Sequence, residues 1–268
     1  KSEFDKSLEY ALSASQIFES IGYKKGIMDS YIFLAWTYSS LHEVEKSIDY
    51  LNRSLSLAIE LKNNEGIARA YNSLGVRANQ QKDPKEALRL YTKALSYLSP
   101  NNSSSTKVYI LCNIGIFYRD HEPEKALPIF KEALAIASKQ DYKSSQSFIH
   151  LNMGLAYTGR KEYLKAEEHL VTSQNLAEQI GDKRRLQEAY FSLIELKIST
   201  GDTEAAHEYH EKYASIRDSL FKTEKAQQIA ELETRYETEK KEQTIKILEQ
   251  EKRLEVIWRN VMSVGVLL

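Results

Sequence analysis

The chain has 268 residues, of which 42% are hydrophobic and 28% charged, with only 10 glycines and 4 prolines. This composition is typical of a protein built mostly of helix and argues against a large β-domain. The formal net charge of −1 gives no general attraction to polyanions, so we expect no nucleic-acid partner and only local recognition. The single cysteine, Cys112, excludes an intramolecular disulfide and any metal site built from several cysteines.

The first predicted element is an amphipathic helix at residues 4–20. The segment SEFDKSLEYALSASQIF has helical periodicity and lacks the apolar core of a signal peptide. Its small residue Ser7 begins a series that continues in steps of 39 or 40 residues at Ser47, Ala87, Ala126, Ala166 and Ala206. We therefore interpret residues 1–26 as the orphan second helix of a truncated repeat, and we expect the sequence to be part of a longer protein.

Five helical hairpins are predicted over residues 27–222. A second series of small residues precedes the first series by about twelve residues, at Ala35, Gly75, Gly115 and Gly154. Each unit of about 40 residues therefore holds two antiparallel helices, which Gly or Ala at the crossing point allows to approach closely. The hairpins are expected to begin near Ile27, Ile67, Thr106, Ser147 and Leu186. We attribute the period of about 40, rather than 34, to polar connectors such as LKNNEG and SPNNSSS.

This pattern resembles the tetratricopeptide repeat (TPR) family in a longer-period form, over roughly residues 4–222. The family pattern is carried by Tyr71, Leu74, Gly75, Ala87, Tyr91 and Ala94, and again by Leu111, Ile114, Gly115, Tyr118, Ala126, Phe130 and Ala133. The last unit departs from it, with Ile194 and Lys197 in place of Gly and Tyr, as a terminal repeat often does. The resemblance implies an all-α, TPR-type α-solenoid that binds a peptide or protein ligand in its groove.

A long charged helix is predicted at residues 223–256, which contain no glycine or proline and are dominated by Glu, Lys and Gln. Ile229, Leu232 and Tyr236 follow a spacing of 3 and 4, whereas a later set follows a spacing of 7 in another register, at Ile247, Leu254 and Val261. The segment is either a weak or interrupted coiled coil, which would make the protein a homodimer, or a single solvated helix with charge pairs such as Glu237 with Lys241.

Residues 257–268 are interpreted as the start of a truncated transmembrane helix. Trp258, Arg259 and Asn260 precede the apolar run VMSVGVLL in the manner of an interfacial anchor, although a span needs about 20 apolar residues. A helix that packs on a partner would look similar over so short a length. The basic residues beside the run favour a cytoplasmic repeat domain by the positive-inside rule.

The order of hairpins, charged helix and apolar segment resembles the sensor half of bacterial TPR-containing membrane signalling proteins. The resemblance implies a membrane-anchored periplasmic domain that senses a ligand or protein. It further implies that a signal passes through the C-terminal helix to a histidine kinase or a DNA-binding output domain. A soluble TPR peptide receptor or scaffold is the alternative.

Candidate ligand-binding residues are predicted on the concave face, which the first helix of each hairpin lines. Asn72, Asn113 and Asn152 occupy nearly the same position in successive hairpins, and their amides can both donate to and accept from a peptide backbone. The alternative is that each asparagine bonds the neighbouring helix. Arg77 and Arg119, a turn further on, either meet an anionic terminus of the ligand or are ordinary surface charges.

No phosphate-binding glycine loop, HExxH or GxSxG motif occurs in the sequence. His207 and His210 could hold a metal ion together with Glu204 or Glu211, but a solvated pair is the ordinary interpretation. We therefore expect no cofactor, no metal and no enzymatic activity in these residues, although the full-length protein could be a histidine kinase.

Overall fold

The computed structural model describes residues 3–265, with side chains described for residues 7–241, 243–254 and 256. Over this part of the chain the structure consists of eleven α-helices and no strand. The helices are α1 (Glu3–Ser20), α2 (Lys24–Ser40), α3 (Val44–Glu60), α4 (Asn64–Gln80), α5 (Pro84–Ser96), α6 (Ser105–His121), α7 (Pro123–Lys139), α8 (Lys143–Gly159), α9 (Tyr163–Ile180), α10 (Lys183–Thr200) and α11 (Thr203–Gly265).

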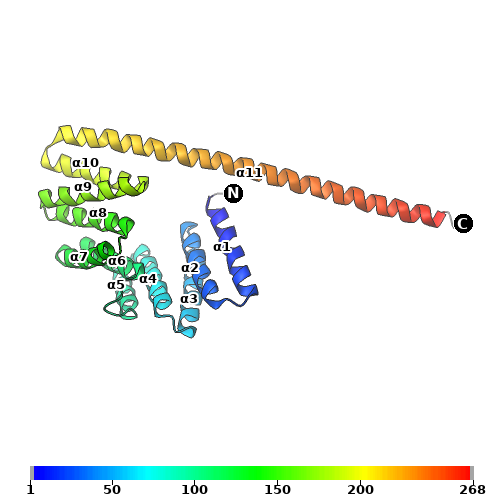
Figure 1. Cartoon of the computed structure of the whole chain (residues 1–268), viewed down its shortest axis with the longest axis horizontal. Helices are drawn as coiled ribbons and strands as arrows, with labels where there is room; N and C mark the ends of the chain where they lie inside the picture. The colour runs from blue at the N-terminus through cyan, green and yellow to red at the C-terminus, as the bar shows by residue number, and fades with distance from the viewer. Residues whose placement is uncertain (1–2, 266–268) are drawn as a thin grey trace.

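The helices stack in sequence order along an arc, as Figure 1 shows. From α2 onwards they form successive hairpins, α2 with α3, α4 with α5, α6 with α7, α8 with α9, and α10 with the first part of α11. The first helices also contact one another along the series α2, α4, α6, α8 and α10, so they form one continuous surface. This architecture confirms the predicted all-α solenoid of helical hairpins.

Short turns and long helices together set the repeat length. Residues in the left-handed region recur near every twentieth position, at Gly22, His42, Lys62, Lys82, Asp141, Lys161, Gly181 and Gly201. Between α3 and α4 the turn is only residues 61–63, because Asn63 already accepts a hydrogen bond from Gly66 N (2.9 Å) as the helix N-cap. The attribution of the 40-residue period to long connectors is therefore wrong, since most of LKNNEG lies within or caps a helix. Within the described chain, residues 97–104 form the one longer connector.

Three helical glycines, Gly75, Gly115 and Gly154, lie where the two helices of a hairpin approach closely. A Cβ at Gly75 would lie 2.6 Å from the Tyr91 ring, and a Cβ at Gly154 would lie 2.6 Å from Leu170. Real Cβ atoms do not approach other atoms so closely, and packed interiors have no room to move them far. The small-residue series in the sequence therefore marks the tight contacts that hold each hairpin closed.

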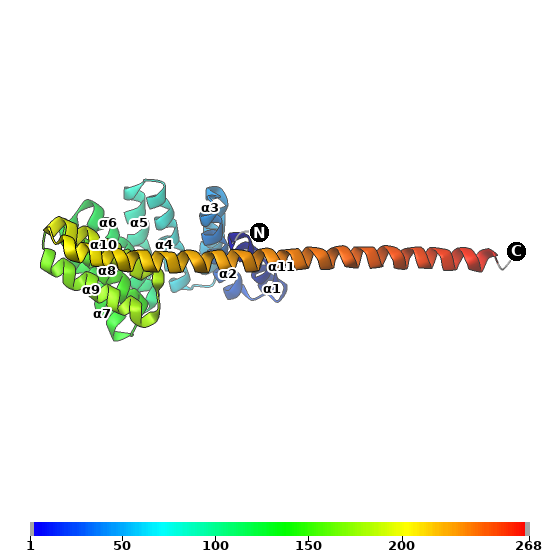
Figure 2. The same cartoon turned by 90° about the horizontal axis from the view of Figure 1, so that it is seen from above.

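α11 belongs partly to the solenoid and partly to no other element. Its first part packs on α10, where Tyr209 lies 6.1 Å from Tyr190 and Lys183 Nζ donates to Ser219 Oγ (2.8 Å). From Phe221 onwards nearly all described side chains are exposed. The helix runs past the open side of the arc and extends beyond α1 (Figures 1 and 2). Its 63 residues correspond to a length of about 95 Å at 1.5 Å per residue.

The expected membrane anchor is wrong. None of the helices formed by the described residues combines the length and the apolar character that a membrane span requires. α11 is long enough, but Glu, Lys and Arg recur along its exposed part, and each would be costly in a bilayer. The membrane-anchored, periplasmic location, which the resemblance to membrane signalling proteins implies, is therefore wrong as well. Of the apolar run at residues 261–268, the last three residues lie outside the described chain.

Candidate ligand-binding groove

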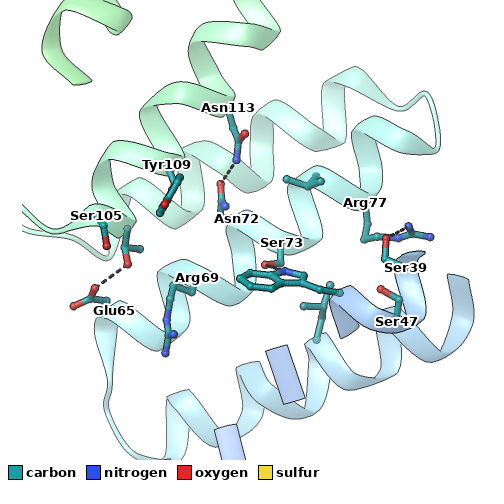
Figure 3. Close-up of a pocket in the computed structure, with 14 residues that line it drawn as sticks. Ser39, Ser47, Glu65, Arg69, Asn72, Ser73, Arg77, Ser105, Tyr109 and Asn113 are labelled. Carbon is teal, nitrogen blue, oxygen red and sulfur yellow. Dashed lines mark hydrogen bonds between the residues drawn. The ribbon is translucent and has the colours of Figure 1, made fainter. Parts of the chain in front are cut away.

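A groove with a volume of about 580 Å³ lies over α4, between α2 and α6 (Figure 3). Its lining comes from the first helices of three successive hairpins, with a small contribution from α3. The lining residues are Trp36, Ser39, Ser47, Leu51, Glu65, Arg69, Asn72, Ser73, Val76, Arg77, Ser105, Thr106, Tyr109 and Asn113. Three of the five residues predicted from sequence, Asn72, Asn113 and Arg77, therefore lie together in one groove.

The two asparagines of the groove are bonded to each other. Asn113 Nδ2 donates to Asn72 Oδ1 over 2.9 Å, which links α6 to α4 (Figure 3). The remaining amide atoms, Nδ2 of Asn72 and Oδ1 of Asn113, have no hydrogen-bond partner among the described residues. One donor and one acceptor are thus left unused at the groove, the complement of the C=O and N–H of a peptide backbone.

Arg77 lies at one end of the groove and is only 8% exposed. Its Nη1 donates to Ser39 Oγ (2.8 Å) and to Gln80 Oε1 (2.6 Å), while its Nε is buried without a partner. Arg69, two turns earlier on α4, differs because it forms an ion pair with Asp29. The charge of Arg69 is therefore paired with a carboxylate, whereas the charge of Arg77 is not.

Two exposed aromatic side chains line the same groove as the asparagine pair. Trp36 on α2 is 53% exposed and Tyr109 on α6 is 55% exposed, although both lie on helices that are otherwise well packed. Trp36 Nε1 donates to Ser73 Oγ (3.3 Å), which holds the indole beside α4. Neither residue is among those predicted from the sequence. A large aromatic side chain on a helix face that carries no core residue is the feature that would have identified them.

The other two predicted residues, Asn152 and Arg119, lie outside this groove and bind each other. Arg119 Nη1 donates to Asn152 Oδ1 (2.6 Å), and Asn152 Nδ2 donates to the backbone carbonyl of Phe148 (2.8 Å). Asn152 is only 3% exposed. Both polar atoms of the Asn152 amide therefore form hydrogen bonds within the protein. This agrees with the alternative interpretation, in which the asparagine bonds a neighbouring helix rather than a ligand.

A second, smaller cavity of about 280 Å³ adjoins the groove, because Tyr109 and Asn113 line both. It extends across α6, α8 and α10 and contains the guanidinium of Arg185, 4.6 Å from the centre of the Phe148 ring. Cys112 also lines it, but burial raises the pKa of this thiol to about 12, so it stays protonated and is a poor nucleophile. The cavity lengthens the groove without adding a reactive group.

The histidine pair considered as a metal ligand lies on the exposed part of the last hairpin. His207 Nε2 lies 3.7 Å from Glu211 Oε1, and both side chains are largely exposed. Across the described side chains, no group of three or more His, Cys, Asp or Glu residues is arranged to hold a metal ion.

Comparison with known proteins identifies the architecture. The model of the tetratricopeptide repeat family matches residues 40–98, which include α3, α4 and α5. The fold is a TPR-type α-solenoid. No curated protein matches the chain in sequence.

Solved TPR-like structures share this solenoid at low sequence identity. BtubC (BKLC) from P. vanneervenii aligns with a TM-score of 0.70 and 16% identity, over 82% of this chain and 93% of that one. A Rap protein complexed with the competence and sporulation factor aligns with a TM-score of 0.62 and 17% identity, over 82% of this chain and 60% of that one. The STAND protein PH0952 from Pyrococcus horikoshii, which has a TPR sensor, aligns with a TM-score of 0.61 and 22% identity, over 80% of this chain and 35% of that one. At these identities the likeness concerns the fold alone.

Proposed function

We propose that the groove over α4 receives an extended segment of a peptide or protein ligand. The observation that carries this proposal is the bonded pair Asn72 and Asn113, which leaves one donor and one acceptor unused. In such a site, Asn72 donates to a backbone carbonyl of the ligand and Asn113 accepts from a backbone N–H. TPR solenoids use their extended concave surfaces for this kind of recognition.

The walls of the groove suit an extended chain. Trp36 and Tyr109 offer exposed aromatic surface on α2 and α6, the helices that border the groove, where ligand side chains would lie. Each new backbone hydrogen bond contributes only about 0.5–1.5 kcal/mol, so burial of ligand side chains against the aromatic rings supplies the rest of the affinity. The asparagines thus bind the backbone of a ligand of any sequence, and contacts with Trp36 and Tyr109 determine which ligand side chains are preferred.

A sensing role is the form of this proposal that the comparisons support best. One structure of similar fold is a Rap protein solved with the competence and sporulation factor, and another carries a TPR sensor in a STAND protein. Because α10 holds the first part of α11, a ligand that changes hairpin stacking would also change the direction of α11. On the sequence resemblance, the receiver of this signal is a histidine kinase or a DNA-binding domain.

The exposed part of α11 offers a surface for a second copy of the chain. Phe221, Leu232 and Leu254 are separated by multiples of eleven residues, and Tyr236 and Ile247 by eleven. At 3.6 residues per turn these five side chains fall on one face of the helix, and each is more than half exposed. We propose that two copies associate through this face, which gives the homodimer expected from the sequence.

Binding to an array of short peptides tests the groove. Wild type is compared with the double variant Asn72→Ala/Asn113→Ala, and Asn79→Ala on the exposed side of α4 serves as the control. We expect peptides held by wild type and by the control to bind the double variant about tenfold more weakly or worse, since two hydrogen bonds are lost. Equal binding by all three proteins would exclude the groove as the peptide site.

A further inference from the structure

Arg77 is a buried cation that lacks an anionic partner. It is 8% exposed, and its partners are the neutral oxygens of Ser39 and Gln80. Lys107, the other buried cation among the described residues, is 7% exposed but pairs with Glu132 at 3.2 Å and donates to the Pro100 carbonyl at 2.8 Å. No described carboxylate lies within ion-pair distance of Arg77, and its Nε also has no acceptor.

The positive charge of Arg77 is only partly compensated. Removing a charged group from water is unfavourable unless opposite charge and hydrogen bonds compensate for the lost hydration. Arg77 lies in the last turn of α4, where the carbonyl end of the helix dipole offsets part of its positive charge. Two neutral acceptors and a helix dipole do not neutralise the charge fully, so a negative group would stabilise it. The side chain lines an open groove, from which such a group could approach.

The surroundings of Arg77 provide further donors toward the groove. Ser39 Oγ accepts from Arg77 and Ser73 Oγ accepts from Trp36, so the hydroxyl hydrogens of both serines have no acceptor among the described residues. Both serines line the groove, and Figure 3 shows Ser39 beside Arg77 and Ser73 further along the groove. The Trp36 indole lies next to them as an apolar wall.

We propose that this end of the groove binds the carboxylate group of a peptide ligand, an inference that rests on the proposed peptide-binding function. The guanidinium of Arg77 and the hydroxyls of Ser39 and Ser73 donate to the carboxylate oxygens, and Trp36 contacts the neighbouring ligand side chain. Because Arg69 is already paired with Asp29, Arg77 is the one arginine of the lining without an opposite charge, and a single positive charge matches one carboxylate better than a doubly charged phosphate. An Asp or Glu side chain and a free C-terminus offer the same group.

Matched peptides test this assignment. Peptides that bind in the array are resynthesised in two sets of pairs: Glu or Gln at each acidic position with an amidated C-terminus, and free acid or amide at the C-terminus without acidic side chains. Dissociation constants are measured for wild type, Arg77→Gln, Arg77→Lys and the control Arg53→Gln, which alters an exposed arginine on α3. Circular dichroism of each variant verifies that the helices are intact.

We expect one set of pairs to show a preference of about tenfold for the carboxylate form in wild type and in Arg53→Gln. The set that shows it identifies the source of the carboxylate. Arg77→Gln should reduce the ratio to near one, and Arg77→Lys should restore part of it because it keeps the charge but loses the planar fork. Peptides that bind through Asn72 and Asn113 without this preference, or a preference that survives Arg77→Gln, would overturn the inference and leave the proposed function standing. If no peptide depends on the asparagine pair, both are overturned.

Discussion

Asn113 donates its amide hydrogen to Asn72 over 2.9 Å and thereby joins the first helices of two successive hairpins at the floor of the groove. The bond fixes both amide planes before any ligand arrives, which reduces the ordering that binding would otherwise require. It also leaves each asparagine with one polar atom unused. A contact that stabilises the solenoid thus prepares the same two residues for recognition.

Close packing within a hairpin predicts opposite effects for two glycines of the same helix, α8. Gly154→Ala places a Cβ 2.6 Å from Leu170 and 3.2 Å from the Ala166 carbonyl oxygen, so we expect the free energy of unfolding to fall by about 1–3 kcal/mol. Gly159→Ala meets nothing within 4 Å and should change it by less than about 1 kcal/mol, in the stabilising direction. Urea denaturation followed by circular dichroism measures both. Equal losses would show that the crossing at Gly154 is not tight.

Arg77 should lower stability in the absence of ligand. Arg77→Met removes an uncompensated buried charge and keeps much of the side-chain volume, so we expect the free energy of unfolding to rise by about 1 kcal/mol or more. Lys107→Met should give no such gain, because Lys107 already has Glu132 and a carbonyl as partners. The comparison uses urea denaturation at low salt. A loss of stability in Arg77→Met would mean that its bonds to Ser39 and Gln80 outweigh the unpaired charge.

A histidine pair within the fourth hairpin predicts sensitivity to acid. His150 Nδ1 and His169 Nδ1 lie 2.9 Å apart, and the Tyr157 ring stacks on His169. Burial, with the nearby His169 as a smaller cause, lowers the pKa of His150 to about 4, and burial also lowers the pKa of His169. In the unfolded chain both pKa values lie near 6.5. The unfolded state therefore binds more protons below that pH, and the pair's contribution to stability is lost as the pH falls from about 6.5 to about 4.

Thermal unfolding across this pH window measures the effect. We expect the midpoint temperature of wild type to fall more steeply than that of His150→Gln/His169→Gln, whose side chains do not titrate. Parallel curves for the two proteins would show that the histidines are protonated as easily in the folded state as in the unfolded one. The nearby charges of Glu168 and Lys131 act on His169 in opposite directions and are unchanged in the variant.

The free face of α11 predicts a dimer that depends on that helix. Light scattering of residues 1–268 across a concentration series should give twice the monomer mass, and residues 1–224 should give the monomer mass. Leu232→Glu should also dissociate the dimer, whereas Leu248→Glu should not, because Leu248 lies on another side of the helix although both leucines are similarly exposed. A monomer mass for every protein would contradict the proposed dimer.

The hairpin pattern was readable from the sequence because tight helix crossings require small side chains. Gly75, Gly115 and Gly154 recur for that reason, and each lies where a Cβ would collide with the opposite helix. The turns were harder to place, because polar residues serve equally well as loop, cap or first helical turn. The sequence predicts a connector at both Asn63 and Asn64, yet Asn63 caps α4 and Asn64 begins it.

The site was only partly predictable, because its contacts depend on how neighbouring helices pack. The three asparagines look equivalent in sequence, but Arg119 reaches Asn152 and occupies its amide, while Asn72 and Asn113 bond each other. The burial of Arg77 likewise depends on the approach of α2 to α4, to which local sequence offers no guide. The membrane interpretation was wrong because it relied on a short apolar run, whereas the preceding part of the same helix carries many charged residues.

The most direct test of the account is a crystal structure of the protein with the peptide that binds it most tightly. We predict a peptide that lies over α4 between α2 and α6, with a backbone carbonyl accepting from Asn72 Nδ2 and a backbone N–H donating to Asn113 Oδ1. A peptide bound elsewhere on the solenoid or on α11, or one held in the groove without contact to either asparagine, would contradict the proposed recognition.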